Sequence, residues 1–229
     1  MLNNTIEEVA AKHYEELAPA IDRVWRDDIA DITKDLHVWA RRLPDESDWE
    51  PQFFELSFGL KRDDDHDPAS IAEPVLVDDR FRLRGSVDLV ERRRGTAQLR
   101  ITDHKTGKNR TKDQTVIGGG AILQPVLYSV CIEQVLGAPV AFGRLFYCTA
   151  AGGFTDHPIA INEANRRVGL EALEIIDRAI ELGFLPPAPD EGACTWCDFR
   201  TVCGPHEEKR IRNKPPERLG DLHALRSRP

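Results

Sequence analysis

The stretch FRLRGSVDLVERRRGTAQLRITDHK, residues 81–105, contains two alternating apolar segments joined by a turn. Residues 81–92 and 97–105 alternate apolar and polar side chains, which is typical of β-strands with one buried face. The RRG sequence at residues 93–95 resembles the connection of a β-hairpin. The pattern therefore predicts two antiparallel strands that lie side by side.

Charged side chains interrupt the apolar faces of both predicted strands. Asp88 lies within an apolar segment, and Asp103 and Lys105 share one face of the next strand because alternate residues point the same way. Removing an ionised carboxylate from water is costly unless it is paired or binds a cation. One interpretation is a simple ion pair with Lys105 or Arg84. The other is that Asp88 and Asp103 bind a divalent cation such as Mg²⁺, while Lys105 acts on a metal-bound water or on a phosphate.

The sequence on either side predicts the other elements of a mixed α/β domain. Further strands are predicted at residues 53–60, 73–78, 141–150 and 154–161, the first two forming an antiparallel meander with the hairpin. Helices are predicted at residues 6–43, with a break near Pro19, at 121–137 and at 162–183. Thr5 and Glu8 have the spacing of a capping box at the first helix.

Composition and charge limit the classes of function. With 229 residues, 41% of them hydrophobic, the chain can bury a substantial core. No apolar run approaches the ~20 residues that cross a bilayer, and the N-terminus is acidic and amphipathic, so we expect a cytoplasmic protein without membrane contact. Five cysteines, an odd number, favour reduced thiols or metal ligands over disulfides. A net charge of -8 argues against binding nucleic acid through overall charge, and the sequence has no Walker-type GxxxxGK[ST] segment.

Four segments together resemble one group of nucleases. GSVDLVE at 85–91 followed by ITDHKTGK at 101–108 resembles the paired motif of the PD-(D/E)xK nucleases. LQPVLYS at 123–129 is similar to the RecB-type and AddB-type nuclease domains of bacterial helicase-nucleases, where a glutamine and a tyrosine on a helix follow the D-x-K strand. FFELSFG at 53–59 matches a further feature of the family, and the resemblance extends over residues 50–210.

The resemblance implies a metal site and its ligands. Asp88 and Asp103 would bind Mg²⁺ or Mn²⁺, with the backbone carbonyl of His104 as a third ligand. Glu55 would be an additional acid near the metal, acting directly or through water. We expect the His104 side chain on the opposite face of the strand and not among the ligands.

The same resemblance implies catalytic roles for three more side chains. Lys105 would activate the nucleophilic water, while Gln124 and Tyr128, four residues apart on one helix face, would position the scissile phosphate or hold the lysine. Taken alone, Gln124 could equally be a surface amide and Tyr128 a core aromatic. His37, on the first predicted helix, is interpreted as an ordinary helix histidine and not as the metal-binding histidine of the family.

Cys194, Cys197 and Cys203 form a C-x2-C-x5-C pattern. Three cysteines this close are rarely independent core residues. The same spacing in AddB-type nucleases and related CRISPR-associated exonucleases holds a 4Fe-4S cluster together with a distant upstream cysteine, so the resemblance implies a cluster here. The upstream ligand is missing, because residues 1–130 contain no cysteine.

Three explanations of the missing ligand remain open. An N-terminal region that contains it has been removed, or Cys131 or Cys148 replaces it, or His206 completes a Cys3His zinc site. In each case the site is expected to be structural and to hold the C-terminal helix against the rest of the domain.

DNA contact is expected from local basic clusters. Such clusters occur at residues 91–95, 105–112 and 207–214. Each could be only a solvated surface. Lys108, Arg110 and Lys112 directly follow the proposed catalytic lysine, so we expect them to bind the DNA backbone without sequence preference.

Taken together, the sequence predicts an α/β, restriction-endonuclease-like mixed sheet of five or six strands flanked by helices, with a C-terminal iron-sulfur or zinc staple. The predicted domains are a helical arm at 1–44, a nuclease core at 45–190, and a cysteine cluster with a basic helix at 191–229. The predicted function is Mg²⁺- or Mn²⁺-dependent exonucleolytic cleavage of DNA in repair or recombination, with a helicase subunit or a removed N-terminal region as partner. The alternative is a non-catalytic DNA-binding and scaffolding module of a helicase-nuclease complex.

Overall fold

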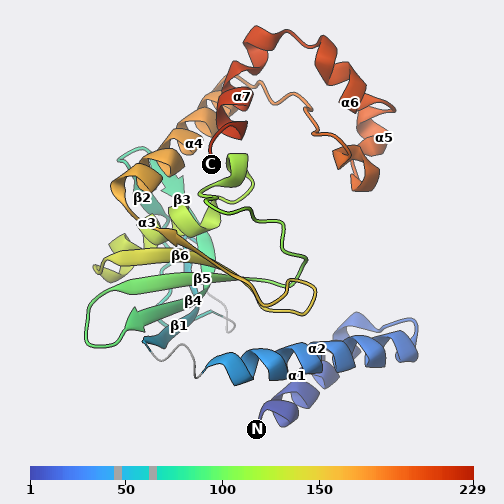
Figure 1. Ribbon diagram of the computed structural model, residues 1–229, viewed down its shortest axis with the longest axis vertical. Coiled ribbons are helices and arrows are strands. Elements are labelled where there is room, and N and C mark those ends of the chain that lie inside the picture. The colour runs from blue at the N-terminus through green and yellow to red at the C-terminus, as the bar shows by residue number, and fades with distance from the viewer. Residues whose placement is uncertain (44–47, 62–65) are drawn as a thin grey trace.

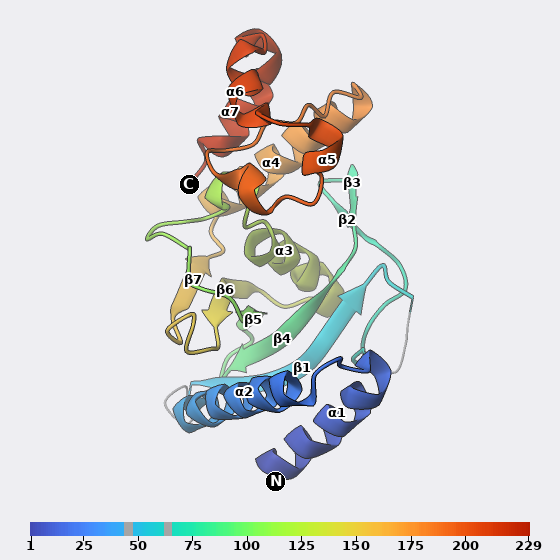
Figure 2. The same cartoon turned by 90° about the vertical axis from the view of Figure 1, so that its right-hand side faces the viewer.

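Five strands form one mixed sheet with helices against both faces (Figures 1 and 2). The computed structural model describes residues 1–43, 48–61 and 66–229, so the predicted domain boundary at residues 44 and 45 lies outside the described residues. In the sheet order β1-β4-β5-β6-β7, strands β5 and β6 pair in parallel and the other neighbours are antiparallel. The strands are β1 (Trp49–Phe58), β4 (Gly85–Arg93), β5 (Leu99–Lys105), β6 (Val140–Tyr147) and β7 (Asp156–Ala160). This arrangement confirms the predicted mixed sheet flanked by helices.

The hairpin predicted from the sequence is formed by β4 and β5. The backbone N–H of Arg93 donates to the carbonyl oxygen of Gln98 at 2.9 Å, and Gly95 supplies the left-handed turn residue with φ +70°. Leu89 lies opposite Thr102 in the register of this pair. That register decides which side chains of the two strands meet.

The predicted strand at residues 81–92 is divided in the structure. β3 (Phe81–Leu83) pairs with β2 (Val75–Val77) in a separate two-stranded sheet. The predicted meander is therefore wrong for this segment. The physical reason is the burial of Val75, Val77 and Phe81, whose side chains pack into the main hydrophobic core.

The main hydrophobic core lies between the sheet and α3 (Gln124–Leu136). It joins apolar side chains of the strands to those of the helix, including Leu56, Val90, Ile101, Leu127 and Ile132. All five are buried, and full burial of one such side chain contributes about 1.5–3 kcal/mol. This core fixes the positions of β4 and β5 beneath the helix.

α3 is the crossover that joins the parallel strands β5 and β6. Pro125 lies in its first turn and Gly137 ends it in the left-handed conformation, as the sequence predicts. The first turn lies against β6 at Gly143, where a Cβ atom would come within 2.2 Å of the Pro125 carbonyl oxygen. Glycine at this position therefore lets the N-terminus of α3 approach the sheet, with Gln124 beside the end of β5.

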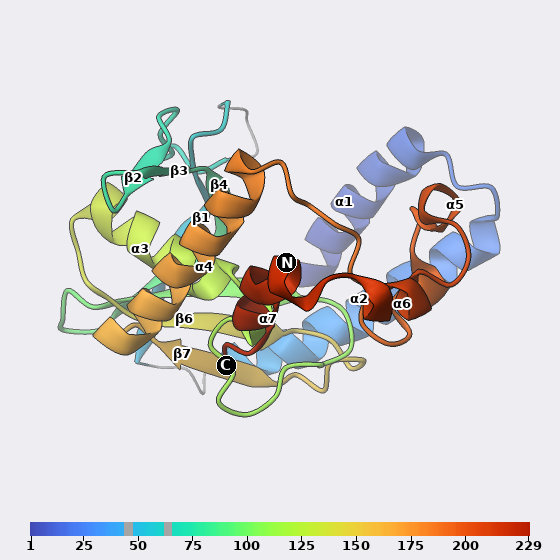
Figure 3. The same ribbon diagram turned by 90° about the horizontal axis from the view of Figure 1, so that it is seen from above.

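α4 (Glu163–Glu181) packs beside α3, and Arg166 donates two hydrogen bonds to Glu133 at 2.5 and 2.7 Å. Short helices follow: η3 (Ala193–Trp196), α5 (Arg200–Cys203), α6 (Glu207–Arg210), η4 (Ile211–Asn213), η5 (Pro216–Leu219) and α7 (Gly220–Arg226). α7 contacts α4 and the short turn η2 (Gly118–Gly120). Figure 3 shows α7 beside α4. The end of the described chain thus lies beside the segment that follows β5.

α1 (Leu2–Leu17) and α2 (Asp22–Arg42) form the predicted helical arm with its break near Pro19. The predicted capping box is wrong, because the first helix already begins after Met1 and the Thr5 hydroxyl donates to the Met1 carbonyl oxygen within the helix. Neither helix has a buried residue. In the described part of the chain, no helix is long and apolar enough to cross a membrane.

A buried ionic cluster lies within the sheet. Glu91 accepts two hydrogen bonds of 2.7 Å from Arg100, and it also contacts Arg144 at 3.3 Å. The hydroxyl of Thr102 donates to Glu91 and accepts from Arg144, at 3.0 and 2.9 Å. Because Glu91 is only 4% exposed, its charge is compensated by these partners rather than by water.

Candidate active site

The two acids of the opening stretch lie on neighbouring strands. The pairing of Leu89 with Thr102 places Asp88 next to Asp103 across the hairpin. One carboxylate oxygen of Asp88 accepts a hydrogen bond from the backbone N–H of His104 at 2.6 Å. Burial raises the pKa of Asp103, and the charge of Asp88 adds to this rise. The structure therefore brings both predicted metal ligands together.

The surroundings shift the pKa values of these acids in opposite directions. For Asp88, burial favours the neutral form, but hydrogen bonds from His104 outweigh it and hold the pKa of Asp88 below its ordinary value. For Asp103, burial dominates and the neighbouring charge of Asp88 adds to it. The contact with Lys105 and the positive charge of its ammonium group lower the pKa of Asp103, but the net shift is still upward. Adjacent acids whose pKa values diverge are frequent in active sites.

Asp103 has an incompletely satisfied carboxylate oxygen. Its Oδ2 atom is buried and lies 2.6 Å from Nζ of Lys105, but it accepts no hydrogen bond of regular geometry from the described residues. The ammonium group of Lys105 compensates the charge at this oxygen, and two adjacent carboxylates can also share a second cation. The oxygen-rich pair of Asp88 and Asp103 thus fits a hard divalent cation, which takes oxygen ligands. The simple ion pair with Lys105 is also present, whereas Arg84 pairs with neither acid among the described residues.

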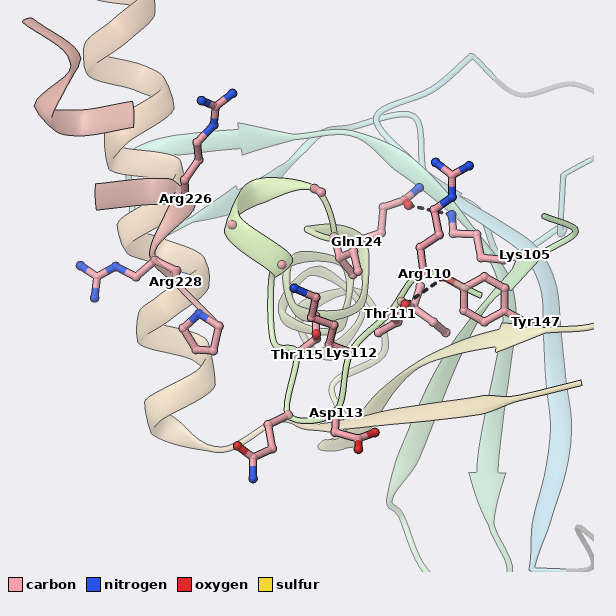
Figure 4. Close-up of a pocket in the computed structure, with 17 residues that line it drawn as sticks. Lys105, Arg110, Thr111, Lys112, Asp113, Thr115, Gln124, Tyr147, Arg226 and Arg228 are labelled. Carbon is pink, nitrogen blue, oxygen red and sulfur yellow. Dashed lines mark hydrogen bonds between the residues drawn. The ribbon is translucent and has the colours of Figure 1, made fainter. Parts of the chain in front are cut away.

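The N-terminal turn of α3 supplies the other two predicted side chains. Lys105 Nζ donates to Oε1 of Gln124 at 3.2 Å, a contact visible in Figure 4. Burial is the main cause that raises the pKa of Tyr128, which lies one turn further along α3, and the neighbouring amide of Gln124 opposes that shift. The ring of Tyr128 also packs edge-on against Phe58, with 5.5 Å between the ring centres. Acid, lysine, amide and phenol therefore form one connected group.

Gly85 is a site residue that sequence reasoning missed. It begins β4, three residues before Asp88, and a Cβ atom there would come within 2.5 Å of the Tyr128 hydroxyl oxygen. Any larger side chain would displace the tyrosine. A glycine at the start of a strand was the available signal, since such a glycine often marks a close approach.

Glu55 lies near the acids but makes a different contact. Its backbone has φ +50°, an interruption of regular strand geometry, and its carboxylate accepts a hydrogen bond from the Ser86 hydroxyl at 3.2 Å. Ser86 lies on the same strand face as Asp88. Among the described residues, no hydrogen bond or ion pair joins Glu55 to Asp88 or Asp103.

The His104 ring lies near Asp88 in a way that the sequence did not indicate. It packs between Trp39 of α2 and Phe146 of β6, each with 6.0 Å between ring centres. Its Nδ1 atom lies 3.6 Å from the Asp88 carboxylate. The histidine therefore supports Asp88 from the α2 side. His37, by contrast, contacts Asn3 of α1 at 2.7 Å, as expected for an ordinary helix histidine.

The cysteine pattern is not assembled into a metal site. Cys194, Cys197 and Cys203 are free thiols, and within the described residues no three His, Cys, Asp or Glu side chains are placed to hold a metal ion. Cys131 belongs to the core, where burial raises its pKa to about 12. Cys148 lies at the end of β6, with its Sγ 3.7 Å from the Lys105 carbonyl oxygen. This arrangement does not fit an iron-sulfur cluster or the Cys3His zinc site with His206.

The predicted DNA-binding residues lie on the segment after β5. Lys108, Arg110 and Lys112 are exposed, and none forms an ion pair with a described acid. The segment is held in place by a hydrogen bond of 2.8 Å between the hydroxyls of Thr111 and Tyr147 (Figure 4). Arg110 and Lys112 line the same cavity as Lys105.

Comparison with known proteins places this site in a family. The PD-(D/E)XK nuclease superfamily matches residues 1–204, so the chain belongs to that superfamily. Membership indicates a nuclease, which hydrolyses phosphodiester bonds. No curated protein matches the chain. A solved structure titled "Crystal structure of SSO0001" is similar over 84% of this chain and 77% of that one, at 16% identity and a TM-score of 0.37, a likeness too low to support a functional argument.

Proposed function

We propose that this protein is a Mg²⁺- or Mn²⁺-dependent deoxyribonuclease with its active site at Asp88, Asp103 and Lys105. The observation that supports this most directly is the pairing of β4 with β5, which places Asp88 next to Asp103, with Lys105 Nζ 2.6 Å from the Asp103 carboxylate. Together with the superfamily match, this makes the two acids the best candidates for metal ligands.

Asp88 and Asp103 would hold the ion, with the His104 backbone carbonyl as a third ligand and Glu55 acting through water. A bound divalent ion supplies Lewis acidity and lowers the pKa of a coordinated water. Although burial opposes it, the hydrogen bonds from His104 lower the pKa of Asp88, which favours the ionised form that a metal ligand needs. The metal set proposed here needs only two side chains, and it is therefore compatible with the lack of a three-residue cluster in the described chain.

Lys105 would act on the attacking water and on the charge that develops at the phosphate. Its ammonium group is held between Asp103 and Gln124, at 2.6 and 3.2 Å. A positive charge fixed in this way stabilises an anionic transition state without further reorganisation. Gln124 and Tyr128 would orient the lysine and the scissile phosphate, because both lie on the face of α3 that meets the lysine.

DNA would be bound through its backbone by Lys108, Arg110 and Lys112. These cations lack acidic partners in the described structure, so they are available to phosphates. Binding of this kind falls steeply with salt and has little sequence preference. Exonucleolytic action, a role in repair or recombination, and a helicase subunit or further N-terminal region as partner belong to the same proposal through the family resemblance.

A cleavage assay with matched variants tests the proposal. Linear single-stranded and double-stranded DNA are incubated with the protein and Mn²⁺, and Asp103→Asn and Lys105→Met are each expected to reduce cleavage by about 100-fold or more. The exposed pair of Asp31 and Lys34, with 2.7 Å between its charged atoms, provides the matched controls Asp31→Asn and Lys34→Met. The proposal is supported if the two control variants cleave DNA at the wild-type rate while the two active-site variants do not cleave it.

The alternative of a non-catalytic DNA-binding and scaffolding module predicts a different result. In that case wild-type protein binds DNA but leaves it intact with every divalent ion tested. Cleavage that survives both Asp103→Asn and Lys105→Met would instead place the active site elsewhere.

A further inference from the structure

The C-terminal half of α2 contacts the candidate active site. Figures 1 and 2 show α2 beside the main sheet. The Trp39 ring packs edge-on against the His104 ring, with 6.0 Å between the ring centres and an angle of 86° between the ring planes. His104 follows Asp103 directly in the chain. A side chain of the helical arm therefore reaches the middle residue of the D-x-K segment.

His104 connects this tryptophan to Asp88. The His104 ring lies between Trp39 and Phe146, and its Nδ1 atom is 3.6 Å from Oδ2 of Asp88. The backbone N–H of His104 donates to the same oxygen at 2.6 Å. Because both contacts end on one carboxylate oxygen, the placement of His104 restricts the position of the Asp88 carboxylate.

α2 is also connected to the backbone of the proposed catalytic lysine through the β6–β7 loop, residues 148–155. One carboxylate oxygen of Asp35 accepts a hydrogen bond from the backbone N–H of Ala150 at 3.0 Å. In the same loop, the backbone N–H of Cys148 donates to the Lys105 carbonyl oxygen at 3.0 Å. The helix therefore contacts the surroundings of both Asp88 and Lys105.

The residues of α2 that make these contacts lie on one face of the helix. Arg42 donates to the Phe154 carbonyl oxygen at 3.2 Å, and its guanidinium group lies over the Phe154 ring, 4.6 Å from the ring centre. Asp35, Trp39 and Arg42 are spaced at i, i+4 and i+7, which is the spacing of one helix face. This face fixes α2 against the active site, with Trp39 at its centre.

A second tryptophan of α2 makes the same kind of contact away from the site. Trp25 packs edge-on against Tyr14 of α1, with 5.8 Å between the ring centres and an angle of 70° between the ring planes. Trp25 and Trp39 are both half-buried. The two tryptophans therefore differ mainly in what they contact, which is the helical arm itself for Trp25 and His104 for Trp39.

We infer that Trp39 is a positioning residue of the active site: it fixes His104 and, through it, the Asp88 carboxylate where a divalent cation binds. The inference rests on the proposed function, because it concerns the metal site of that proposal. Replacing a residue that orients a metal ligand typically weakens metal binding by roughly 10–100-fold. Trp39 orients the partner of a ligand, so we expect the lower end of this range.

The affinity for Mn²⁺ in the absence of DNA tests the role of Trp39. The electron paramagnetic resonance signal of free Mn²⁺ falls as the ion binds, so a titration gives the Kd, and Asp103→Asn identifies the binding that belongs to the site. Trp39→Ala should raise this Kd by about 10-fold. Trp39→Phe, which keeps a ring for the edge-on contact, should restore an affinity close to that of the wild-type protein.

Trp25→Ala is the matched control, because it removes a similar ring contact from the same helix. It should bind Mn²⁺ as the wild-type protein does. If Trp39→Ala fails to fold, Trp39→Leu keeps an apolar side chain without the ring and should weaken Mn²⁺ binding in the same way. A loss of stability alone would affect both tryptophan positions and would not be rescued by phenylalanine.

A second measurement needs no metal. The amide proton of His104 donates to a carboxylate at 2.6 Å, and such a short, charge-assisted hydrogen bond moves its NMR signal downfield. Trp39→Ala should shift this signal upfield, whereas Trp25→Ala should leave it in place.

The outcomes separate the positioning role from the nuclease activity. An unchanged Kd in Trp39→Ala, or an equal loss of affinity in Trp25→Ala, overturns the inference. A wild-type protein that binds Mn²⁺ through Asp103 but leaves DNA intact would refute only the proposed nuclease activity. Cleavage that requires Asp103, together with Mn²⁺ binding that does not depend on Trp39, would refute only the positioning role.

Discussion

Replacing Asp103 by asparagine removes a charge while keeping the shape of the side chain. Burial raises the pKa of Asp103, so ionising this carboxyl group costs more in the folded protein than in water. Lys105 loses its partner, but its side chain is 38% exposed and such ion pairs are worth about 0–1 kcal/mol. We therefore expect the unfolding free energy of the metal-free protein at pH 7 to change by less than about 1 kcal/mol, or roughly 2–4 °C in Tm for a chain of this length.

The same substitution should have a large effect when metal is present. At a metal concentration 100 times the Kd, binding adds about 2.7 kcal/mol to the stability of the wild-type protein, which corresponds to roughly 5–11 °C at 2–4 °C per kcal/mol. Asp103→Asn should lose nearly all of this increase. Thermal unfolding with and without Mn²⁺ measures both effects, and Asp31→Asn, which breaks an exposed Asp–Lys pair, is the control.

Two results would refute this reasoning. An undiminished Mn²⁺-induced rise in Tm in Asp103→Asn would mean that Asp103 is not a ligand. A loss of several kcal/mol in the metal-free variant would mean that the contact with Lys105 is a structural ion pair, which the raised pKa of Asp103 argues against.

Further predictions concern pH, the buried ionic cluster and the close approach of β4 to α3. The Mn²⁺-induced rise in Tm should disappear as pH falls through the raised pKa of Asp103, at a higher pH than for an ordinary aspartate ligand, which a titration of Tm measures. Glu91→Gln removes the acid that the buried Arg100 and Arg144 share, so it should lower the unfolding free energy by about 3–5 kcal/mol. Glu50→Gln, in an exposed ion pair with Arg94, is the control and should lower the unfolding free energy by less than about 1 kcal/mol. A denaturant titration measures both. Gly85→Ala should displace Tyr128 and reduce DNA cleavage, while Gly220→Ala, with an ordinary φ and open space around the new Cβ, should leave the rate unchanged.

Local patterns predicted the elements that form the candidate site. The alternation of β4 and β5 and the turn between them determine which faces meet, so the proximity of Asp88 and Asp103 could be expected from two short segments. The spacing of Gln124 and Tyr128 on one helix likewise placed both side chains near the lysine. These contacts depend on strand and helix periodicity, which the sequence expresses directly.

Contacts between distant segments could not be predicted in this way. The division of residues 81–92 follows from packing of Phe81 on the core, and alternation alone does not reveal where a strand leaves its sheet. The role of Gly85 depends on Tyr128, which lies on another element. The docking of Pro229 on η2 depends on backbone N–H groups that no residue pattern identifies.

The metal staple predicted from the cysteine pattern is not supported by the described residues. The spacing of Cys194, Cys197 and Cys203 predicted a metal staple, yet the described residues contain no group of three ligands that would hold a metal. The C-terminal segment, residues 220–229, is instead held by ion pairs such as Arg178 with Asp221 and by backbone hydrogen bonds. Sequence spacing shows that ligands could meet, whereas the surrounding chain decides whether they do.

The most direct test of the account is the anomalous scattering of Mn²⁺ in crystals of the protein. We predict one ion between the Asp88 and Asp103 carboxylates, bound to an oxygen of each at about 2.0–2.2 Å, near the distance that oxygen ligands take around Mg²⁺. Density for the ion that touches one carboxylate alone, or that lies away from both while cleavage proceeds, would contradict the shared-ion site on which the proposed function depends.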